Sequence, residues 1–219
     1  MTESTGTGHL DTTRAAYDAV AVQYTELFAD GFGARPLDRA MVEALAGLVL
    51  QEGGGPVADL GCGPGHVTAY LHGLGVDAFG IDVSPAMVAI ARSRHPQLRF
   101  EEGPMLGPGL AAGSLGGILA HYSLIHTPPE ELPGVLAEFH RLLAPGGHVL
   151  IAVQSTDGPV PPVTPYDHKV APAYRWWPDA LAALLREAGL TEVARLVRRP
   201  YEDERTPHAQ LLAQRPAAC

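Results

Sequence analysis

The chain has 219 residues, a net charge of −9 at pH 7 and a pI near 5.5, so it is long enough for one substantial core and too acidic for a general nucleic-acid binder. Hydrophobic residues make up 46% of it and charged residues 18%, as in ordinary soluble globular proteins. Two cysteines cannot form a disulfide framework, and neither a signal peptide nor an apolar run of membrane-spanning length is seen, so we expect a cytoplasmic protein that acts without a membrane.

The first part of the chain predicts two helices ahead of any strand. Residues 1–11 are rich in Thr and Gly and are expected to be disordered. Residues 12–28 carry apolar side chains at helical spacing, and after a glycine-containing break a second helix begins at Pro36 and ends before the glycines of residues 53–55. We expect this N-terminal region to form lid helices, the first lying over a ligand site and the second packing on a sheet.

From residue 57 onward, short apolar strands alternate with helical segments. The predicted strands are residues 57–59, 76–82, 98–102, 115–121, 148–154, 191–197 and 208–212, and the predicted helices are residues 66–72, 84–94, 128–143 and 178–188. Strands that are apolar throughout are typical of a parallel sheet covered on both faces. Residues 155–173 carry five prolines and no periodicity, which predicts a long loop within a single domain spanning residues 1–219.

The segment with the clearest chemistry is residues 57–65, which predict a strand, a tight turn and the start of a helix. Its three glycines at alternate positions leave the turn without side chains, so a ligand can lie against the backbone. The helix start offers free N–H groups, and Asp59 adds a negative charge beside them. Backbone donors and a carboxylate together suit a ligand that has both acceptors and a cation.

A dinucleotide is the first ligand to consider for this turn. The dinucleotide fingerprint has G-x-G-x-x-G and an acid about 20 residues later. Here the third glycine comes one residue early, and His66 stands where that fingerprint has glycine. A carboxylate at Asp59 would not help a pyrophosphate, so the pattern fits NAD poorly.

The pattern instead resembles motif I of the class I (Rossmann-like) S-adenosylmethionine-dependent methyltransferases, Asp-x-Gly-x-Gly-x-Gly, at residues 59–65. Residues 79–87 resemble motif II, residues 139–148 the family's helix–turn–strand segment with Pro-Gly-Gly, and residues 17–24 its N-terminal lid helix. The resemblance covers nearly the whole chain and is to the small-molecule type. It implies an α/β fold: a three-layer sandwich with a mostly parallel seven-stranded sheet whose last strand is antiparallel.

The resemblance also implies S-adenosyl-L-methionine as cofactor and a set of contacts to it. The backbone at Gly61 and Gly63 receives the methionine and ribose portions, Asp59 lies near the methionine ammonium through a water, and Asp82 takes the ribose hydroxyls. The other expected cofactor contacts are Tyr17, Tyr24, Cys62, Val83, Met87, Met105 and His121. A departure from the family is Pro104, where members often carry an acid, so adenine recognition is expected to rest on the Met105 backbone and apolar packing.

Two histidines are candidates for a catalytic base on the acceptor side. His126 follows the fourth strand and has an ordinary pKa near neutrality, although a capping or packing role fits it equally well. His168 in the proline-rich loop is the second candidate. Trp176 and Trp177 are expected to pack that loop onto the sheet. The histidines and cysteines lack the spacing of a zinc site, so no metal is expected.

The expected function is methyl transfer to a small molecule by a monomer or homodimer. Methylation of a hydroxyl or carboxyl oxygen is favoured, with N-methylation next. The Ala-, Gly-, Pro- and Arg-rich composition is typical of a GC-rich bacterial genome, and by analogy with such enzymes we expect a role in secondary metabolism. A protein of the same fold that binds the cofactor without transferring methyl is the alternative, and an NAD-dependent oxidoreductase comes third. The small basic cluster Arg195, Arg198 and Arg199 is expected to be a solvated strand edge or to form surface pairs.

Overall fold

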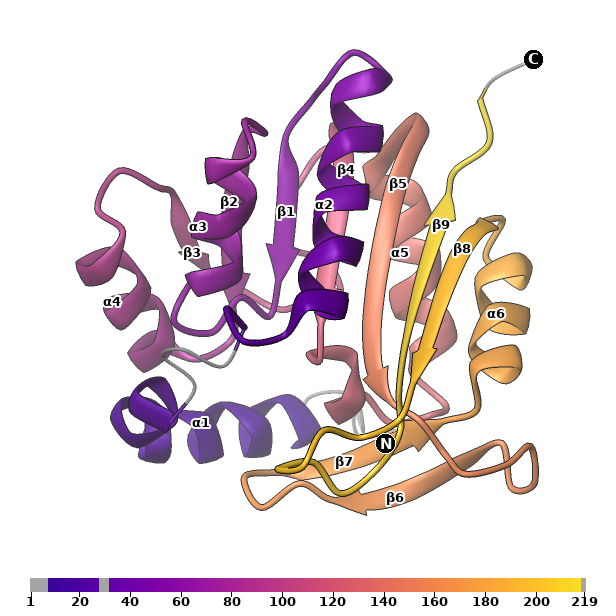
Figure 1. Ribbon diagram of the computed structural model, residues 1–219. Coiled ribbons are helices and arrows are strands. Elements are labelled where there is room, and N and C mark those ends of the chain that lie inside the picture. Colours follow the sequence, from indigo (N-terminus) through magenta and orange to yellow (C-terminus); the bar gives the residue numbers. More distant parts are fainter. Residues whose placement is uncertain (1–7, 28–31, 218–219) are drawn as a thin grey trace, which may run out of the picture.

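A seven-stranded sheet forms the middle layer of the computed structural model, which describes residues 8–27 and 32–217 (Figure 1). The strand order is β3-β2-β1-β4-β5-β9-β8. The strands are β1 (Val57–Leu60), β2 (Ala78–Asp82), β3 (Phe100–Glu102), β4 (Leu115–His121), β5 (Leu143–Gln154), β8 (Thr191–Arg198) and β9 (His208–Gln214). Strands β1 to β5 pair in parallel, whereas β9 is antiparallel to both β5 and β8. The predicted sheet, including its antiparallel last strand, is confirmed.

The strand order reverses between β1 and β4. From β1 the chain adds β2 and β3 on one side, and it then crosses back to add β4 and β5 on the other. Parallel α/β sheets bind ligands in the crevice outside the carboxyl ends of the strands at such a switch point. The glycine turn that follows β1 and the residues that follow β4 therefore meet where a ligand is expected.

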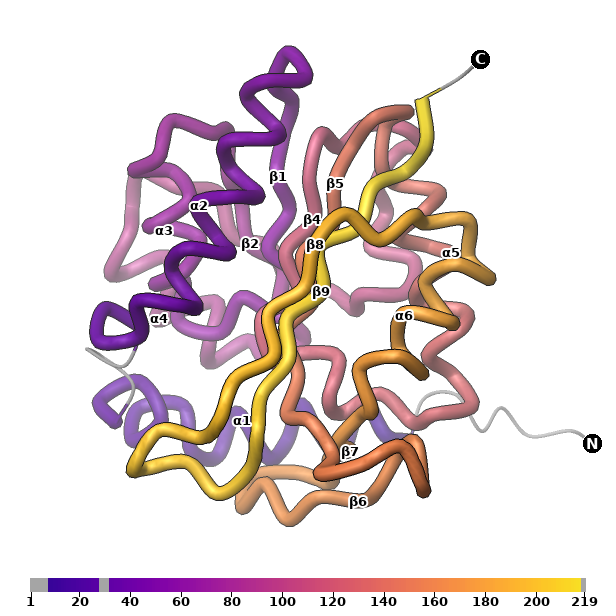
Figure 2. Tube along the Cα trace, turned by 45° about the vertical axis from the view of Figure 1, so that its right-hand side comes forward, coloured from indigo at the N-terminus to yellow at the C-terminus, as the bar shows by residue number. Residues whose placement is uncertain are grey.

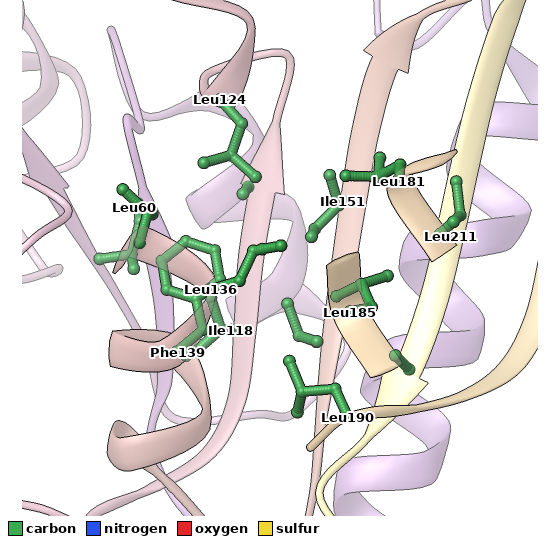
Figure 3. Close-up of a cluster of buried hydrophobic side chains, with 14 of the residues drawn as sticks. Leu60, Ile118, Leu124, Leu136, Phe139, Ile151, Leu181, Leu185, Leu190 and Leu211 are labelled. Atoms are coloured by element: carbon green, nitrogen blue, oxygen red, sulfur yellow. The ribbon is translucent and has the colours of Figure 1, made fainter. Parts of the chain in front are cut away.

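Helices cover both faces of the sheet, as the apolar strands predicted. The helices α2 (Pro36–Gln51) and α3 (His66–Gly73) pack on one face, and α5 (Leu132–Leu142) and α6 (Pro178–Glu187) on the other. The helix α4 (Pro85–Arg94) packs against β2 and β3. Figure 3 shows the larger cluster, in which Phe139 and Leu136 of α5 pack against Ile118 of β4. Truncating a buried Phe of this kind costs about 3–5 kcal/mol.

The first helix, α1 (Gly8–Leu27), crosses the carboxyl edge of the sheet and packs against α4 (Figures 1 and 2). Its place agrees with the expected lid. It begins at Gly8, so the expectation of disorder is wrong for residues 8–11, while residues 1–7 lie outside the described part of the chain. None of the helices within residues 8–27 and 32–217 is long and apolar enough to cross a membrane.

The expectation of a loop at residues 155–173 is wrong for the parts of this segment that form two strands, while residues 156–162 and 168–171 have no regular structure. This region holds β6 (Val163–Asp167), which pairs antiparallel with β7 (Pro172–Trp176), and the hairpin lies at the same edge of the sheet as α1 (Figure 1). Prolines are tolerated there because a two-stranded ribbon has only edge strands. The buried Ala173 and Trp176 join the main core and anchor the hairpin, so the expectation that Trp176 packs this region onto the sheet is confirmed, whereas Trp177 is only half-buried.

We expect Gly80→Ala to destabilise the protein. A Cβ on Gly80 in β2 would lie 2.6 Å from Sγ of Cys62 and 2.6 Å from the ring of Phe100. Overpacking of this kind lowers the free energy of unfolding by about 1–3 kcal/mol, which urea unfolding followed by circular dichroism measures. Gly47→Ala is the matched control, since a Cβ there meets no heavy atom within 4 Å, and it should raise stability by about 0.5–1 kcal/mol. Equal urea midpoints for the two variants would contradict this account.

Candidate functional site

Two neighbouring cavities open at the carboxyl ends of the strands. The first, which we call the lid cavity, lies between α1 and the ends of β2 and β4. The second, which we call the hairpin cavity, is bordered by the glycine turn, β5, the β6–β7 hairpin and the β8–β9 connection. The residues that line both cavities form a throat between them: Tyr24, Gly61, Gly63, His121 and Tyr122.

The glycine turn forms one wall of the throat. A Cβ on Gly61 would lie 2.3 Å from Cβ of Ser123, whose hydroxyl donates a 2.6 Å hydrogen bond to the Leu60 carbonyl. Gly61 is therefore required by the close approach of the segment after β4. At Gly63, φ is +53°, and a Cβ would meet no heavy atom within 4 Å. The space beside Gly63 is open to both cavities, so a ligand can lie directly on this backbone.

Asp82 joins the glycine turn to the next strand end. Its Oδ2 accepts a 2.8 Å hydrogen bond from the Gly63 N–H, and its Oδ1 accepts one of the same length from the Ser84 N–H. Burial raises the pKa of the Asp82 carboxyl, and these backbone donors oppose that shift. A carboxylate has about four lone-pair sites, so Asp82 can still accept two hydroxyls from a ligand in the lid cavity.

Asp59 is only 1% exposed, and its Oδ2 accepts a 2.6 Å hydrogen bond from the Thr68 hydroxyl. Burial raises its pKa to about 7. The residue lines the hairpin cavity, where a cation would favour its charged form. Cys62 lines the same cavity, but it packs with Val88 and Phe100 in a small apolar cluster, and burial raises the pKa of its thiol.

Two adjacent residues of the lid helix α1, Tyr17 and Asp18, hold the helix in place through polar contacts. Oδ1 of Asp18 accepts hydrogen bonds from the Ser84 hydroxyl at 2.5 Å and from the Ala86 N–H at 3.1 Å, at the amino end of α4. The Tyr17 hydroxyl lies 2.8 Å from Nε2 of His126. The sequence placed Asp18 in a lid-helix segment but gave it no role, because its partners are more than 60 positions away.

His126 has partners at both ring nitrogens. Its Nδ1 lies 2.8 Å from the Pro172 carbonyl, which can only accept, so Nδ1 carries the hydrogen. In that neutral tautomer Nε2 accepts from the Tyr17 hydroxyl. Burial lowers the pKa of His126, which favours this neutral form. The ring lies in the short 3₁₀ helix η1 (Leu124–His126) and bridges the lid to β7, a packing role that the sequence left open.

Among the described histidines that line the hairpin cavity, two have a buried ring nitrogen without a hydrogen-bond partner: His168 at Nδ1 and His121 at Nε2. The His168 ring lies edge-on to His126 with centroids 5.0 Å apart, so the structure brings the two candidate bases together. Burial lowers the pKa of His168 to about 4 and that of His121 to about 3. Both rings are therefore neutral near pH 7.

The structure brings every predicted site residue to one of the two cavities. The lid cavity is lined by Tyr17, Tyr24, Gly61, Gly63, Asp82, Val83, Met87, Met105, His121 and His126, and the hairpin cavity additionally by Asp59, Cys62 and His168. Pro104, at which this chain departs from the family pattern, also lines the lid cavity. Within the described residues no group of three or more His, Cys, Asp or Glu side chains could hold a metal ion.

A buried polar network at the wall of the hairpin cavity is not indicated by the sequence. Tyr122 has a φ of +56°, and its hydroxyl lies 2.7 Å from Nδ1 of His208. Nε2 of His208 lies 3.6 Å from Glu204, whose carboxylate pairs with Arg198 at 2.5 Å, and Arg198 also pairs with Asp38 at 3.2 Å. Arg198 is only 7% exposed, so the expectation of a solvated position is wrong for this residue. Its partners lie on other elements, and no local pattern indicates them.

Comparison with known proteins gives a consistent set of relatives. A family model described as a methyltransferase domain matches residues 57–147. The chain is 32% identical over 188 residues to demethylmenaquinone methyltransferase of Beutenbergia cavernae, covering 73% of this chain and 68% of that protein. It is 32% identical over 116 residues to malonyl-[acyl-carrier protein] O-methyltransferase of Pectobacterium atrosepticum, covering 53% of this chain. It spans 45% of the length of that second relative.

A solved structure shows the same fold over almost the whole chain. It is the 1,6-didemethyltoxoflavin-N1-methyltransferase of Burkholderia thailandensis, which was crystallised with 1,6-didemethyltoxoflavin and S-adenosylhomocysteine. The TM-score is 0.77 at 23% sequence identity, covering 99% of this chain and 92% of that one.

Removing the Asp18 carboxylate should loosen the lid. Asp18→Ala deletes the acceptor of two hydrogen bonds that join α1 to α4, and hydrogen bonds to charged groups contribute about 1.5–3 kcal/mol. We expect the amides of α1 to exchange with deuterium at least about tenfold faster, as measured by hydrogen-exchange mass spectrometry. Glu26→Ala alters an exposed carboxylate of the same helix and is the control. Unchanged exchange in Asp18→Ala would show that other contacts hold the lid.

Proposed function

Because the chain belongs to the class I S-adenosylmethionine-dependent methyltransferases, we propose that it transfers a methyl group from S-adenosylmethionine to a small-molecule acceptor. The observation that carries the proposal is the position of Asp82. Its carboxylate is fixed by the backbone of the glycine turn and faces a cavity with apolar walls. The two carboxylate oxygens suit the two hydroxyls of a ribose. The apolar wall beside them suits a flat base attached to that ribose.

The other expected cofactor contacts fit the same orientation. Val83, Met87 and Met105 would pack against the adenine in the lid cavity, where Pro104 adds apolar surface in place of an acid. The backbone of Gly61 and Gly63 would receive the methionine portion, with Asp59 beside its ammonium. The sulfonium would then lie in the throat, near Tyr24 and His121, with the acceptor beyond it in the hairpin cavity.

The methyl group would be transferred by in-line displacement. The cofactor supplies an electrophilic methyl, whose bond to sulfur breaks as a bond to an acceptor oxygen or nitrogen forms. The chain's own residues align the two molecules and take up the acceptor's proton. His168 has an unpartnered Nδ1 at the hairpin cavity and is our proposed base, while both nitrogens of His126 hold the lid to β7. We propose O-methylation in bacterial secondary metabolism first and N-methylation second.

The proposal is tested in two steps. Calorimetric titration with S-adenosylmethionine, S-adenosylhomocysteine and NADH should show binding of the two sulfur ligands only. A metabolite extract incubated with methyl-labelled cofactor should then yield a product heavier by one labelled methyl group, and His168→Ala should form it more slowly. Absence of binding by either sulfur ligand would refute the proposed methyl transfer. Binding without any labelled product would favour the alternative of a protein that binds the cofactor without transferring methyl.

Asp82→Asn should weaken cofactor binding about 100-fold. The substitution removes the charge that would accept two ribose hydroxyls, and losing two charge-assisted hydrogen bonds costs about 3 kcal/mol. Calorimetry with S-adenosylhomocysteine measures the loss, and the urea midpoint of the variant shows that it is folded. Glu101→Gln, on the adjacent strand β3, is the control, because its half-exposed carboxylate pairs only with Arg99 among the contacts described and should leave affinity unchanged. Equal affinities of the two variants would exclude Asp82 as the ribose ligand.

Cofactor affinity should depend on the ionisation of Asp59. Its pKa is about 7 because burial disfavours the charge, and a bound ammonium needs the charged form. The association constant for S-adenosylhomocysteine should therefore fall about tenfold per pH unit below pH 7 and level off above it. Asp59→Asn should remove this dependence. Methylthioadenosine, which lacks the amino acid portion, is the control ligand, and a pH-independent affinity for S-adenosylhomocysteine would place the ammonium elsewhere.

A further inference from the structure

The hairpin cavity contains hydrogen-bonding atoms that the described part of the chain leaves without partners. They are Oε1 of Gln154, Nδ1 of His168 and, at the throat, Nε2 of His121. Gln154 is the last residue of β5 and is only 8% exposed. A buried polar atom without a partner is costly, so native structures normally supply one. Three such atoms around one cavity indicate that a ligand supplies the missing hydrogen bonds.

Two arginines at or directly behind the same cavity are already paired with carboxylates of the chain. Arg35 pairs with Asp203 at 2.6 Å and with Glu204 at 3.2 Å. Arg198, which lies behind the residues that line the cavity, pairs with Asp38 and with Oε2 of Glu204. The guanidinium groups of Arg35 and Arg198 are therefore already paired with carboxylates of the chain itself.

Apart from Arg35, Arg205 is the only arginine or lysine among the described residues that line the cavity, and it lies at the rim. Its guanidinium lies over the ring of Tyr166, 4.9 Å from the centroid, and 3.8 Å from a carboxylate oxygen of Asp167. The carboxylates that line the cavity also outnumber the guanidinium groups. A carboxylate ligand is normally bound by a bidentate arginine, and here it would meet an excess of negative charge.

Aromatic rings are the largest group among the remaining residues that line the cavity. They are Phe32, Tyr24, Tyr122, Tyr166 and the imidazoles of His66, His121, His168 and His208. Burial lowers the pKa of His66 and of His208 to about 4, so these rings are uncharged near pH 7, as are His121 and His168. Flat apolar faces with a few neutral hydrogen-bonding atoms at their edges suit a flat ligand with a polar edge.

We propose that the hairpin cavity takes the methyl acceptor as an uncharged aromatic or heteroaromatic molecule, holds its O–H or N–H group at the Gln154 amide and His168, and excludes carboxylates. This inference rests on the proposed function and narrows it, since carboxyl methylation is removed from the expected reactions. The bond from methyl carbon to sulfur breaks and a bond from methyl carbon to oxygen or nitrogen forms. The acceptor's proton passes to Nδ1 of His168, in the tautomer with its hydrogen on Nε2, and then to solvent.

The test uses ring-matched pairs of probes that differ only in charge. Phenol and benzoate, 1-naphthol and 1-naphthoate, and 8-hydroxyquinoline and quinoline-8-carboxylate are titrated at pH 7.5 into the full chain saturated with S-adenosylhomocysteine. We expect the hydroxyl member of at least one pair to bind at least tenfold more tightly than its carboxylate. Tighter binding of the carboxylates, or no binding of any hydroxyl probe to a protein that does bind S-adenosylhomocysteine, would overturn the inference.

Two substitutions locate the bound probe. Gln154→Leu should weaken binding of the hydroxyl probe about tenfold without altering affinity for S-adenosylhomocysteine, and Gln214→Leu, at the opposite end of the sheet, is the matched control. Arg205→Gln should leave the hydroxyl probe unaffected, whereas a carboxylate site would lose its binding with this change. An unchanged affinity in Gln154→Leu would overturn the assignment. If the unmodified chain does not bind S-adenosylhomocysteine, that result would instead refute the proposed function.

Discussion

The site depends on the hydrogen bonds that Asp82 accepts from the backbone of Gly63 and Ser84. These bonds fix the turn after β1 against the end of β2, and Ser84 in turn donates to Asp18 of the lid. A single carboxylate thus positions the glycine turn, the start of α4 and, through one hydroxyl, the helix that covers the cavity. Its burial is tolerated because backbone donors replace the water that the charge loses.

The two cavities are built by different means. The lid cavity uses glycines, Asp82 and apolar side chains that follow β2 and β3, so its recognition is largely through backbone and shape. The hairpin cavity adds to the glycine turn the side chains of β5, the β6–β7 hairpin and the β8–β9 connection, which are distant in sequence. Substitutions in the hairpin or the connection can therefore alter the lining of the hairpin cavity without changing the glycine turn or Asp82.

That difference also explains what the sequence could predict. The sheet, its flanking helices and the residues around Asp59 and Asp82 follow from local patterns, namely apolar runs, glycine spacing and acids at strand ends. The hairpin was missed because prolines at positions 161, 162 and 165 argue against strands unless both strands are known to be edges. The partners of His126 and Arg198 were missed because each lies on another element, and only the fold brings them together.

His126 couples the two halves of the site. One ring nitrogen bonds Tyr17 of the lid and the other bonds the Pro172 carbonyl at the start of β7, so the lid and the hairpin share a single imidazole. A lid that moved outward would free Nε2, and a hairpin that moved would free Nδ1, and either change leaves a buried polar atom without its partner. The positions of the lid and of the hairpin are therefore linked. The histidine that the sequence offered as a candidate base joins α1 to the start of β7 through its two ring nitrogens.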